Sequence, residues 1–300
     1  MNNYQILLDV WEGRPVQHCD WSILTANGVA GAIVRLNDIH NGHHKDVNFD
    51  AAWNFLEGKL RAPYFVLNPW VSGKENFNWL QNNTDFSHRV FIDIEVKKAD
   101  VTPRRYADLV DEFFDYMGER ATGIYTGYWF LQYVARWPTH VPYWWAGYST
   151  QLTNCKTWDA YKRVLSGINY ANWVKNAPGG ADNVPIWQCS GDGCYLPGFG
   201  NRDIDVNVVP GSYEQVKNWL LGLPVPETTE EKMVTLPIKK VLRNLNVRKA
   251  PAITAQIVDR LPINSEVVIL DNQAQGNNRW LRVGINQWIA EIYNGVRYVE

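Results

Sequence analysis

Hydrophobic runs of six or seven residues recur along the first part of the chain, separated by longer stretches of mixed polarity. Their length and their content of β-branched and aromatic residues are typical of buried strands. The runs lie at residues 5–10, 31–36, 63–68, 90–96, 122–127, 142–148 and 184–189. We expect a strand at each of these positions.

Between several of these runs the spacing of apolar residues is that of a helix, for example at 47–60 and 102–120. In the second stretch Thr102 is placed to cap the helix and Pro103 to occupy its first turn. One face of this helix gathers Tyr106, Leu109, Val110, Phe113 and Met117. Strands that alternate with helices predict right-handed βαβ crossovers, and at this length an α/β fold: an irregular (β/α) barrel of TIM-barrel type.

The pattern changes at residues 220–237, where prolines, threonines and glutamates replace the periodic hydrophobic residues. This composition is typical of a linker. We therefore expect a barrel domain at 1–221, a linker at 222–236 and a second domain at 237–300. Short alternating runs broken by Pro, Asn and Gly predict that the second domain is a small all-β barrel.

Charge and hydropathy exclude some partners. The formal net charge is −2, with 29 Lys and Arg against 31 Asp and Glu, so no basic excess is available for nucleic acid. No stretch reaches the roughly 18 apolar residues that membrane insertion requires. The start, MNNYQILLDVWEG, lacks the features of a secretory signal, so we expect a protein that is cytoplasmic on synthesis.

The candidate metal ligands do not form a standard pattern. The four cysteines, Cys19, Cys155, Cys189 and Cys194, lack a C-x-x-C spacing, and the histidines of DIHNGHHKD (38–46) match no known ligand spacing. We expect no metal, and a polar loop at 38–46 in which His40 or His43 could contact a substrate. Free thiols are favoured in a reducing compartment, although pairing of Cys189 with Cys194 stays open.

The stretch RVFIDIEVKK (89–98) carries two carboxylates inside a run that otherwise resembles a buried strand. Alternation along a strand turns Val90, Ile92, Ile94 and Val96 toward the helices, and Phe91, Asp93 and Glu95 into the barrel. Both acids come late in the strand, at the end of the barrel where enzymes of this fold keep their chemistry.

Further acids occupy comparable places: Asp9 ends the first run, and Asp203 and Asp205 follow the last one. Crowded carboxylates raise one another's pKa, so one can stay protonated as a general acid while another is ionised. Cleavage of a glycosidic bond requires this division of roles. The 15 tryptophans and 15 tyrosines also suit sugar rings, although about half of them are expected in the core.

The order of several motifs resembles glycoside hydrolase family 25, the lysozymes of the Chalaropsis and phage endolysin type, over residues 4–212. The motifs are Asp9, FIDIEV, GIYTGYWF, PYWWAGYS and VPIWQCSGDG with DIDVN. The resemblance implies hydrolysis of the β-1,4 bond between N-acetylmuramic acid and N-acetylglucosamine in peptidoglycan. It implies that Glu95 is the general acid and that Asp93 orients the 2-acetamido group, with Asp9 and Asp205 as supporting acids.

The same resemblance places Tyr125, Tyr148 and Trp187 in the substrate groove. The sequence departs from the family in the first loop, DVWEGRPVQHCDW, and in Arg35, where a lysine is usual. In the third strand, FVLNPW places Asn68 and Trp70 near the mouth of the barrel. We expect Arg35 and Asn68 to bind substrate.

Residues 241–294 resemble a bacterial Src-homology-3-like domain through LNVRKAP, WLRV and QWIAEIY. Such a module implies binding to a cell-wall peptide and would concentrate the enzyme at an insoluble substrate. The combined interpretation is a phage or prophage endolysin that needs no cofactor and acts on the cell wall after release from the host cell. Two alternatives stay open: a non-catalytic wall-binding or virion structural protein, and a glycosidase that acts on another N-acetylated polysaccharide such as chitin.

Overall fold

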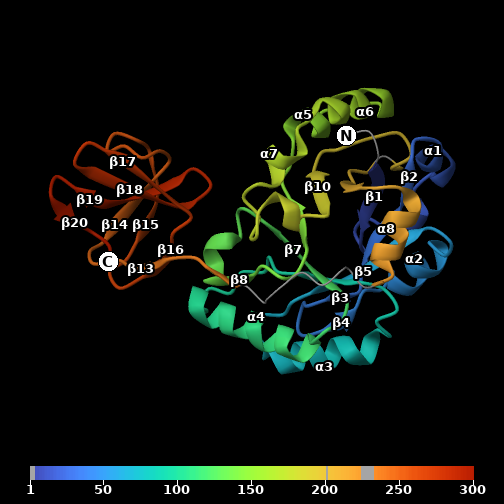
Figure 1. Ribbon diagram of the computed structural model, residues 1–300, viewed down its shortest axis with the longest axis horizontal. Helices are drawn as coiled ribbons and strands as arrows, with labels where there is room; N and C mark the ends of the chain where they lie inside the picture. The colour runs from blue at the N-terminus through green and yellow to red at the C-terminus, as the bar shows by residue number, and fades with distance from the viewer. Residues whose placement is uncertain (1–3, 201, 224–232) are drawn as a thin grey trace.

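Eight strands of the first lobe close into a barrel in the computed structural model, which describes residues 4–200, 202–223 and 233–300 (Figure 1). Around the barrel the order is β1-β11-β10-β9-β7-β6-β5-β2. The bounds are β1 (Tyr4–Val10), β2 (Val29–Arg35), β5 (Leu60–Val66), β6 (Val90–Asp93), β7 (Thr122–Gly127), β9 (Tyr143–Ala146), β10 (Ile186–Ser190) and β11 (Asp205–Pro210). Each of the seven expected strands is present, and the closed barrel is confirmed.

The predicted βαβ crossovers imply a parallel sheet, and this is wrong at one strand. β11 runs antiparallel to both of its neighbours, β10 and β1, whereas the other neighbouring strands are parallel. The described residues between β10 and β11 contain no helix, so the chain returns directly in the opposite direction. β11 consequently begins, rather than ends, at the mouth of the barrel.

Helices surround the barrel in Figure 1, with α3 and α4 along one side and α5 to α7 along another. Their bounds are α1 (Trp21–Ala26), α2 (Phe49–Phe55), α3 (Gly73–Asn83), α4 (Pro103–Met117), α5 (Thr150–Thr153), α6 (Trp158–Gly167), α7 (Tyr170–Val174) and α8 (Tyr213–Leu220). Shorter pieces are η1 (Val16–His18), η2 (Leu131–Tyr133), η3 (Ala181–Asn183), β3 (Asn37–Asp38), β4 (His44–Lys45) and β8 (Arg136–Pro138). Thr102 caps α4, with its hydroxyl accepting from the Arg105 N–H at 3.3 Å, as predicted.

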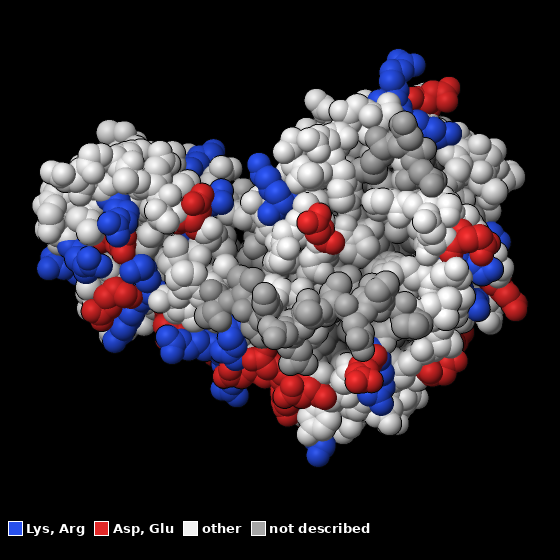
Figure 2. Space-filling model, in the orientation of Figure 1, with Lys and Arg blue, Asp and Glu red and all other residues white. Residues whose placement is uncertain are grey.

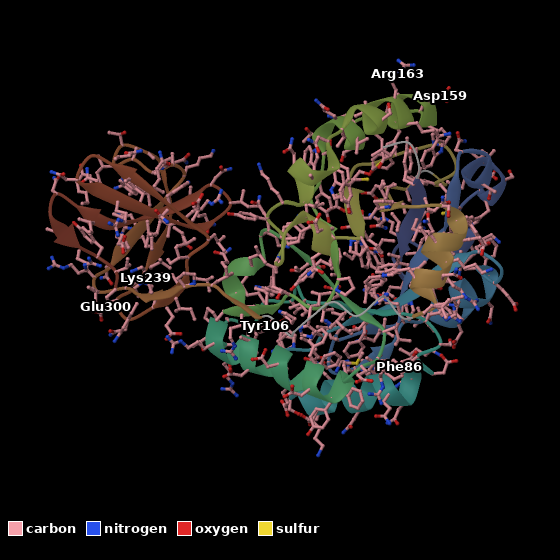
Figure 3. The ribbon with its side chains drawn as sticks, in the orientation of Figure 1. Phe86, Tyr106, Asp159, Arg163, Lys239 and Glu300 are labelled. Atoms are coloured by element: carbon pink, nitrogen blue, oxygen red, sulfur yellow. The ribbon has the colours of Figure 1, made fainter. Side chains whose placement is uncertain are left out.

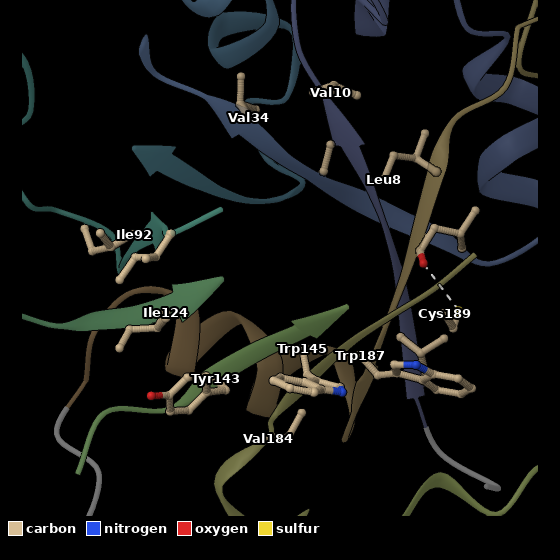
Figure 4. Close-up of a cluster of buried hydrophobic side chains, with 14 of the residues drawn as sticks. Leu8, Val10, Val34, Ile92, Ile124, Tyr143, Trp145, Val184, Trp187 and Cys189 are labelled. Carbon is tan, nitrogen blue, oxygen red and sulfur yellow. Dashed lines mark hydrogen bonds between the residues drawn. The ribbon is translucent and has the colours of Figure 1, made fainter. Parts of the chain in front are cut away.

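Two hydrophobic cores follow from the alternation of side chains along the strands. The interior of the barrel is filled by side chains such as Leu7, Tyr64, Phe91 and Trp144. The outer core lies between strands and helices and contains Leu8, Val10, Val34, Ile92, Ile124, Trp145 and Trp187 (Figure 4). Along β6 the predicted alternation is confirmed, but Val96, beyond the strand, packs against the inner core instead.

The second lobe is built of strands and has its own core. Its strands are β13 (Ile238–Lys240), β14 (Leu245–Arg248), β15 (Ile257–Leu261), β16 (Glu266–Val268), β17 (Asp271–Gln275), β18 (Asn278–Gly284), β19 (Gln287–Tyr293) and β20 (Val296–Arg297). β15, β14, β19, β18 and β17 form one sheet in that order, β20 pairs with β19, and β13 pairs with β16. Trp280, Leu281 and Ile289 are buried at the centre of this lobe.

A strand of the expected linker belongs to the first lobe. β12 (Met233–Thr235) pairs antiparallel with β8, and the Leu236 N–H donates to the Ala135 carbonyl at 2.9 Å. Residues 224–232 of the expected linker lie outside the described residues. The lobes also meet where the Arg282 guanidinium lies 5.1 Å from the ring centroid of Tyr128.

The surface carries charges of both signs. On the face shown in Figure 2, acidic and basic side chains are interspersed rather than gathered by sign. Within the described ranges, no helix is both long and apolar enough to cross a membrane. Each of the four cysteines is a free thiol.

Gly31 on β2 provides a test of how tightly the barrel is built. A Cβ atom there would lie 1.6 Å from the Leu60 carbonyl oxygen on β5, so the strands would have to separate. We expect Gly31→Ala to lower the free energy of unfolding by about 3 kcal/mol, measured by chemical denaturation. Gly167→Ala is the control, because a Cβ at Gly167 meets no atom within 4 Å. An equal loss of unfolding free energy in both variants would contradict a close approach of β2 and β5 at Gly31.

Candidate active site

Four carboxylates meet at the mouth of the barrel. Asp9 lies near the end of β1 and pairs in register with Asp205, the first residue of the reversed strand β11. Asp93 ends β6, beside Val66 on β5 and Tyr125 on β7. The reversal of β11 is what brings Asp205 to the same end of the barrel as the other acids.

Glu95 lies just beyond β6 rather than within it, which corrects the predicted strand end. The segment stays extended because the Ile94 N–H donates to the Tyr125 carbonyl at 2.9 Å. The Thr126 hydroxyl donates to the Ile94 carbonyl, also at 2.9 Å. These two bonds hold Glu95 within electrostatic range of Asp9, Asp93 and Asp205, each of whose pKa it raises.

Burial raises the pKa of every acid in this group, and repulsion between carboxylates raises those of Asp9, Asp93 and Asp205 further. Asp9 and Asp93 are 9% and 5% exposed, and loss of solvent raises the pKa of each well above its ordinary value. Repulsion from neighbouring carboxylates adds to both shifts. Burial raises the pKa of Glu95 to about 7, and burial, followed by repulsion from Asp192 and Asp203, raises that of Asp205 to about 7.

Two carboxylate oxygens in the mouth are buried without a hydrogen-bond partner among the described residues: Oδ1 of Asp9 and Oδ1 of Asp93. Buried polar atoms are normally paired, and unpaired ones are costly. These two oxygens are therefore the atoms of the site that are best placed to hold a proton or to bond a ligand.

Gln188 on β10 connects the acids to two tyrosines. No motif in the sequence indicated it as a site residue. Its Oε1 accepts from the hydroxyls of Tyr125 at 2.8 Å and Tyr148 at 2.9 Å. Its Nε2 donates to Asp9 Oδ2 at 3.1 Å and, more weakly, to Asp205 Oδ2 at 3.4 Å. The available signal was a polar residue at an inward position of a hydrophobic strand, the same signal that identified Asp93.

The two tyrosines differ in depth. Tyr125 is buried inside the barrel, with its ring centroid 4.4 Å from that of Trp144. Tyr148 is 42% exposed, and its ring centroid lies 5.7 Å from that of Trp129. Tyr148 thus exposes its ring to solvent while its hydroxyl bonds Gln188. Tyr125 bonds the same Gln188 oxygen from the interior of the barrel.

Arg35, at the end of β2, is held by the residues of the unusual first loop. Its guanidinium lies 5.0 Å from the ring centroid of Trp11, and its Nη2 is 3.5 Å from Glu12 Oε1. Its Nε donates to Asp46 Oδ2 at 2.7 Å. The positive charge of Arg35 opposes the rise in the pKa of Asp9. The first loop and Arg35 therefore pack together as one structural unit.

Asn68 follows β5 and is buried in a tight turn. Its Oδ1 accepts from the Trp70 N–H at 2.9 Å, while its backbone bonds to the side chain of Asn76 in both directions. Its acceptor oxygen is thus engaged in shaping the turn. The turn leaves the side chain of Trp70 54% exposed to solvent.

Trp187 does not reach the mouth, which corrects its expected place in the groove. It is fully buried in the outer core, where its Nε1 donates to the Gly147 carbonyl at 2.7 Å and its ring stacks on Trp173 (Figure 4). Since Gln188 points into the barrel, its neighbour Trp187 must point outward.

His43 is engaged in contacts with its neighbours. Its ring packs against those of Phe65 and Trp79, which also contact each other, and its nitrogens bond to Asn37 and Asn76 at 3.0 and 3.1 Å. Across the described part of the chain, no group of three or more His, Cys, Asp or Glu residues is arranged to hold a metal ion.

Solved structures share this fold at low sequence identity. A family GH25 lysozyme from Aspergillus fumigatus aligns with a TM-score of 0.52 and 15% identity over 72% of this chain and 99% of its own. A muramidase from Trichobolus zukalii aligns with a TM-score of 0.51 and 18% identity over 73% and 99%. The spore cortex lytic enzyme SleM of Clostridium perfringens aligns with a TM-score of 0.51 and 16% identity over 99% and 97%. No family model and no curated protein sequence matches the chain.

The raised pKa of Glu95 predicts a pH-dependent stability. Because its pKa of about 7 in the folded protein lies above the ordinary value of 4.5, the folded state binds more protons between these pH values. The free energy of unfolding should therefore fall as the pH rises through this window. We expect Glu95→Gln to be more stable than the wild type at pH 8, by about 2 to 3 kcal/mol, with the difference vanishing toward pH 4.

The measurement is denaturant unfolding at several pH values, with the exposed Glu57→Gln as the control. A difference between wild type and Glu95→Gln that is the same at pH 4 and pH 8 would contradict a buried, proton-binding Glu95.

Proposed function

We propose that this chain is a peptidoglycan hydrolase, an N-acetylmuramidase that cleaves the β-1,4 bond between N-acetylmuramic acid and N-acetylglucosamine. The observation that carries the proposal is the pairing of Glu95, whose pKa is about 7, with the buried Asp93 at the mouth of a barrel of the GH25 fold. A carboxyl group with this pKa is protonated in a useful fraction at neutral pH and can act as a general acid.

In the first step Glu95 gives its proton to the glycosidic oxygen as the bond to C1 breaks. Oδ1 of Asp93, which has no hydrogen-bond partner among the described residues, would accept from the N–H of the 2-acetamido group, whose carbonyl oxygen would then attack C1. This scheme is the substrate-assisted alternative to a protein nucleophile. It requires that Asp93 hold one orientation of the acetamide.

In the second step the deprotonated Glu95 removes a proton from water, which adds to C1 and restores the acetamide. Asp9 and Asp205 would support this cycle as neighbouring acids whose own pKa values are raised by Glu95. Gln188 fixes the position of both supporting acids.

Aromatic and charged side chains around the mouth are suited to bind the glycan strand. Tyr148 and Trp70 expose flat apolar faces of the kind that pack against sugar rings. Arg35 contributes a positive charge near Asp9. The Tyr125 hydroxyl orients Gln188 by a hydrogen bond, and Asn68 positions Trp70 in the same way.

A wider biological role is proposed from the same reasoning. The chain would act as a phage or prophage endolysin, made in the host cytoplasm and active on the wall after release. Residues 237–300 would form the Src-homology-3-like module that binds a wall peptide. The all-β architecture of the second lobe supports this assignment.

Activity separates the proposal from its alternatives. We expect Glu95→Gln to clear a suspension of purified cell walls about a thousandfold more slowly than the wild type, because the proton donor is lost. Asp93→Asn should also be strongly impaired, and Glu57→Gln should match the wild type. Mass analysis of the soluble fragments should find muramic acid at the new reducing ends.

Other outcomes point elsewhere. No clearing by any variant would favour a non-catalytic wall-binding or virion protein, and reducing ends released from chitin but not from peptidoglycan would favour a chitinolytic enzyme. Clearing by Glu95→Gln at the wild-type rate would refute the assigned role of Glu95.

Wall binding by the second lobe is tested with the inactive full-length Glu95→Gln protein. β15 is an edge strand of its sheet and exposes Ile257 and Val258, features that suit an extended peptide. We expect the added change Val258→Asp to weaken cosedimentation with purified walls roughly fivefold. Ile285→Asp, at an exposed turn of the same lobe, is the matched control. Equal retention of both variants would contradict binding at β15.

A further inference from the structure

A cavity of about 550 Å³ lies among the loops that follow the barrel strands, outside the group of carboxylates. Its lining includes His18, Ile23, Lys156, Tyr195, Pro197 and Arg202. These residues come from the segments after β1, β9 and β10, which all leave the barrel at its mouth. The volume is in the range of cavities that hold small ligands.

The loop between β10 and β11 joins this cavity to the active site. At its start, Gly191 packs so closely on Tyr148 that a Cβ would lie 3.0 Å from the ring. Near its end, Asp203 ion-pairs with Arg14 and accepts from the Gly193 N–H at 3.0 Å. The next acid along this segment is Asp205. The loop that lines the cavity therefore packs on Tyr148 of the mouth at its start and is bonded to Arg14 two residues before Asp205.

The cavity has a surplus of positive charge. Lys156 and Arg202 are exposed cations on its lining. The carboxylate on the lining, Asp20, already caps α1 by accepting from the backbone N–H groups of Ser22 and Ile23 at 3.0 and 3.2 Å. Arg202 donates one bond to the Gly13 carbonyl at 3.0 Å, which leaves donors of its guanidinium without another hydrogen bond among the described residues.

Apolar surface accompanies these charges. The half-exposed ring of Tyr195 lies 5.6 Å from the Lys156 ammonium, and Ile23, Leu196 and Pro197 line the cavity beside it. A ligand that combines carboxylates with short aliphatic groups would match both the cations and the apolar surface. A phosphate polymer would use the cations but would leave this apolar surface unmatched.

We propose that this cavity binds the carboxylate-bearing peptide that branches from the glycan strand next to the cleaved bond. The proposal rests on the proposed function, since it assigns the peptide part of the same substrate. Lys156 and Arg202 pair with peptide carboxylates, while Tyr195 and its neighbours contact the aliphatic side chains. The cavity thereby positions a strand whose sugars occupy the mouth.

The test compares two substrates, intact peptidoglycan and the same glycan after an amidase has removed its peptides. We expect the double variant Lys156→Gln, Arg202→Gln to raise KM about three- to tenfold on the intact substrate, with kcat unchanged. On the stripped glycan it should equal the wild type. The matched control, Arg163→Gln with Lys175→Gln, removes two exposed charges elsewhere, Arg163 lying on the outer side of α6 (Figure 3).

An equal change on both substrates, or no change on either, would overturn the proposal. A second measurement separates it from the proposed function. The inactive Glu95→Gln protein is titrated with a synthetic stem tetrapeptide, with its terminal carboxylate free or amidated, and with poly(glycerol phosphate). Tighter binding of the free carboxylate form, lost in the double variant, supports the cavity even if the wild type cleaves neither substrate. Preference for poly(glycerol phosphate), or equal binding of both peptides, refutes it.

Discussion

Crowding of four carboxylates in a buried mouth is the constraint on which the rest of this structure depends. Water is withdrawn from Asp9 and Asp93, so the ionised forms are disfavoured, and each additional acid increases the cost. The four carboxylates would move apart unless the backbone held them together. The barrel supplies that backbone, and Gln188 links two of the acids by hydrogen bonds whose direction two tyrosine hydroxyls determine.

Much of this arrangement can be predicted from the sequence because strand periodicity is a local property. Alternation along 90–96 places Asp93 inside the barrel and Ile92 outside, as observed. Applied equally strictly to 184–189, it would have turned Gln188 inward and Trp187 outward, whereas the motif resemblance favoured Trp187. The rule derived from backbone geometry was the better guide there.

Other features depend on contacts between distant segments, which periodicity does not report. The direction of β11 follows from a connection without a helix, and nothing in its own hydrophobic run reveals it. The environment of Arg35 likewise requires Trp11 and Asp46 to fold onto it. Trp11 and Glu12 of the first loop both contact Arg35, and no local pattern in the sequence indicates that contact.

The reversed strand β11 also has a consequence for the order of folding. It closes the barrel by pairing with β1, so the seam joins segments about 200 residues apart, as in the pairing of Leu7 with Asn207. Contacts of such high sequence separation are the slowest to form, because the intervening chain must be ordered or looped out first. Asp9 and Asp205 face each other across this seam. A nascent or partly folded chain therefore lacks the carboxylate cluster, which forms only when the barrel closes.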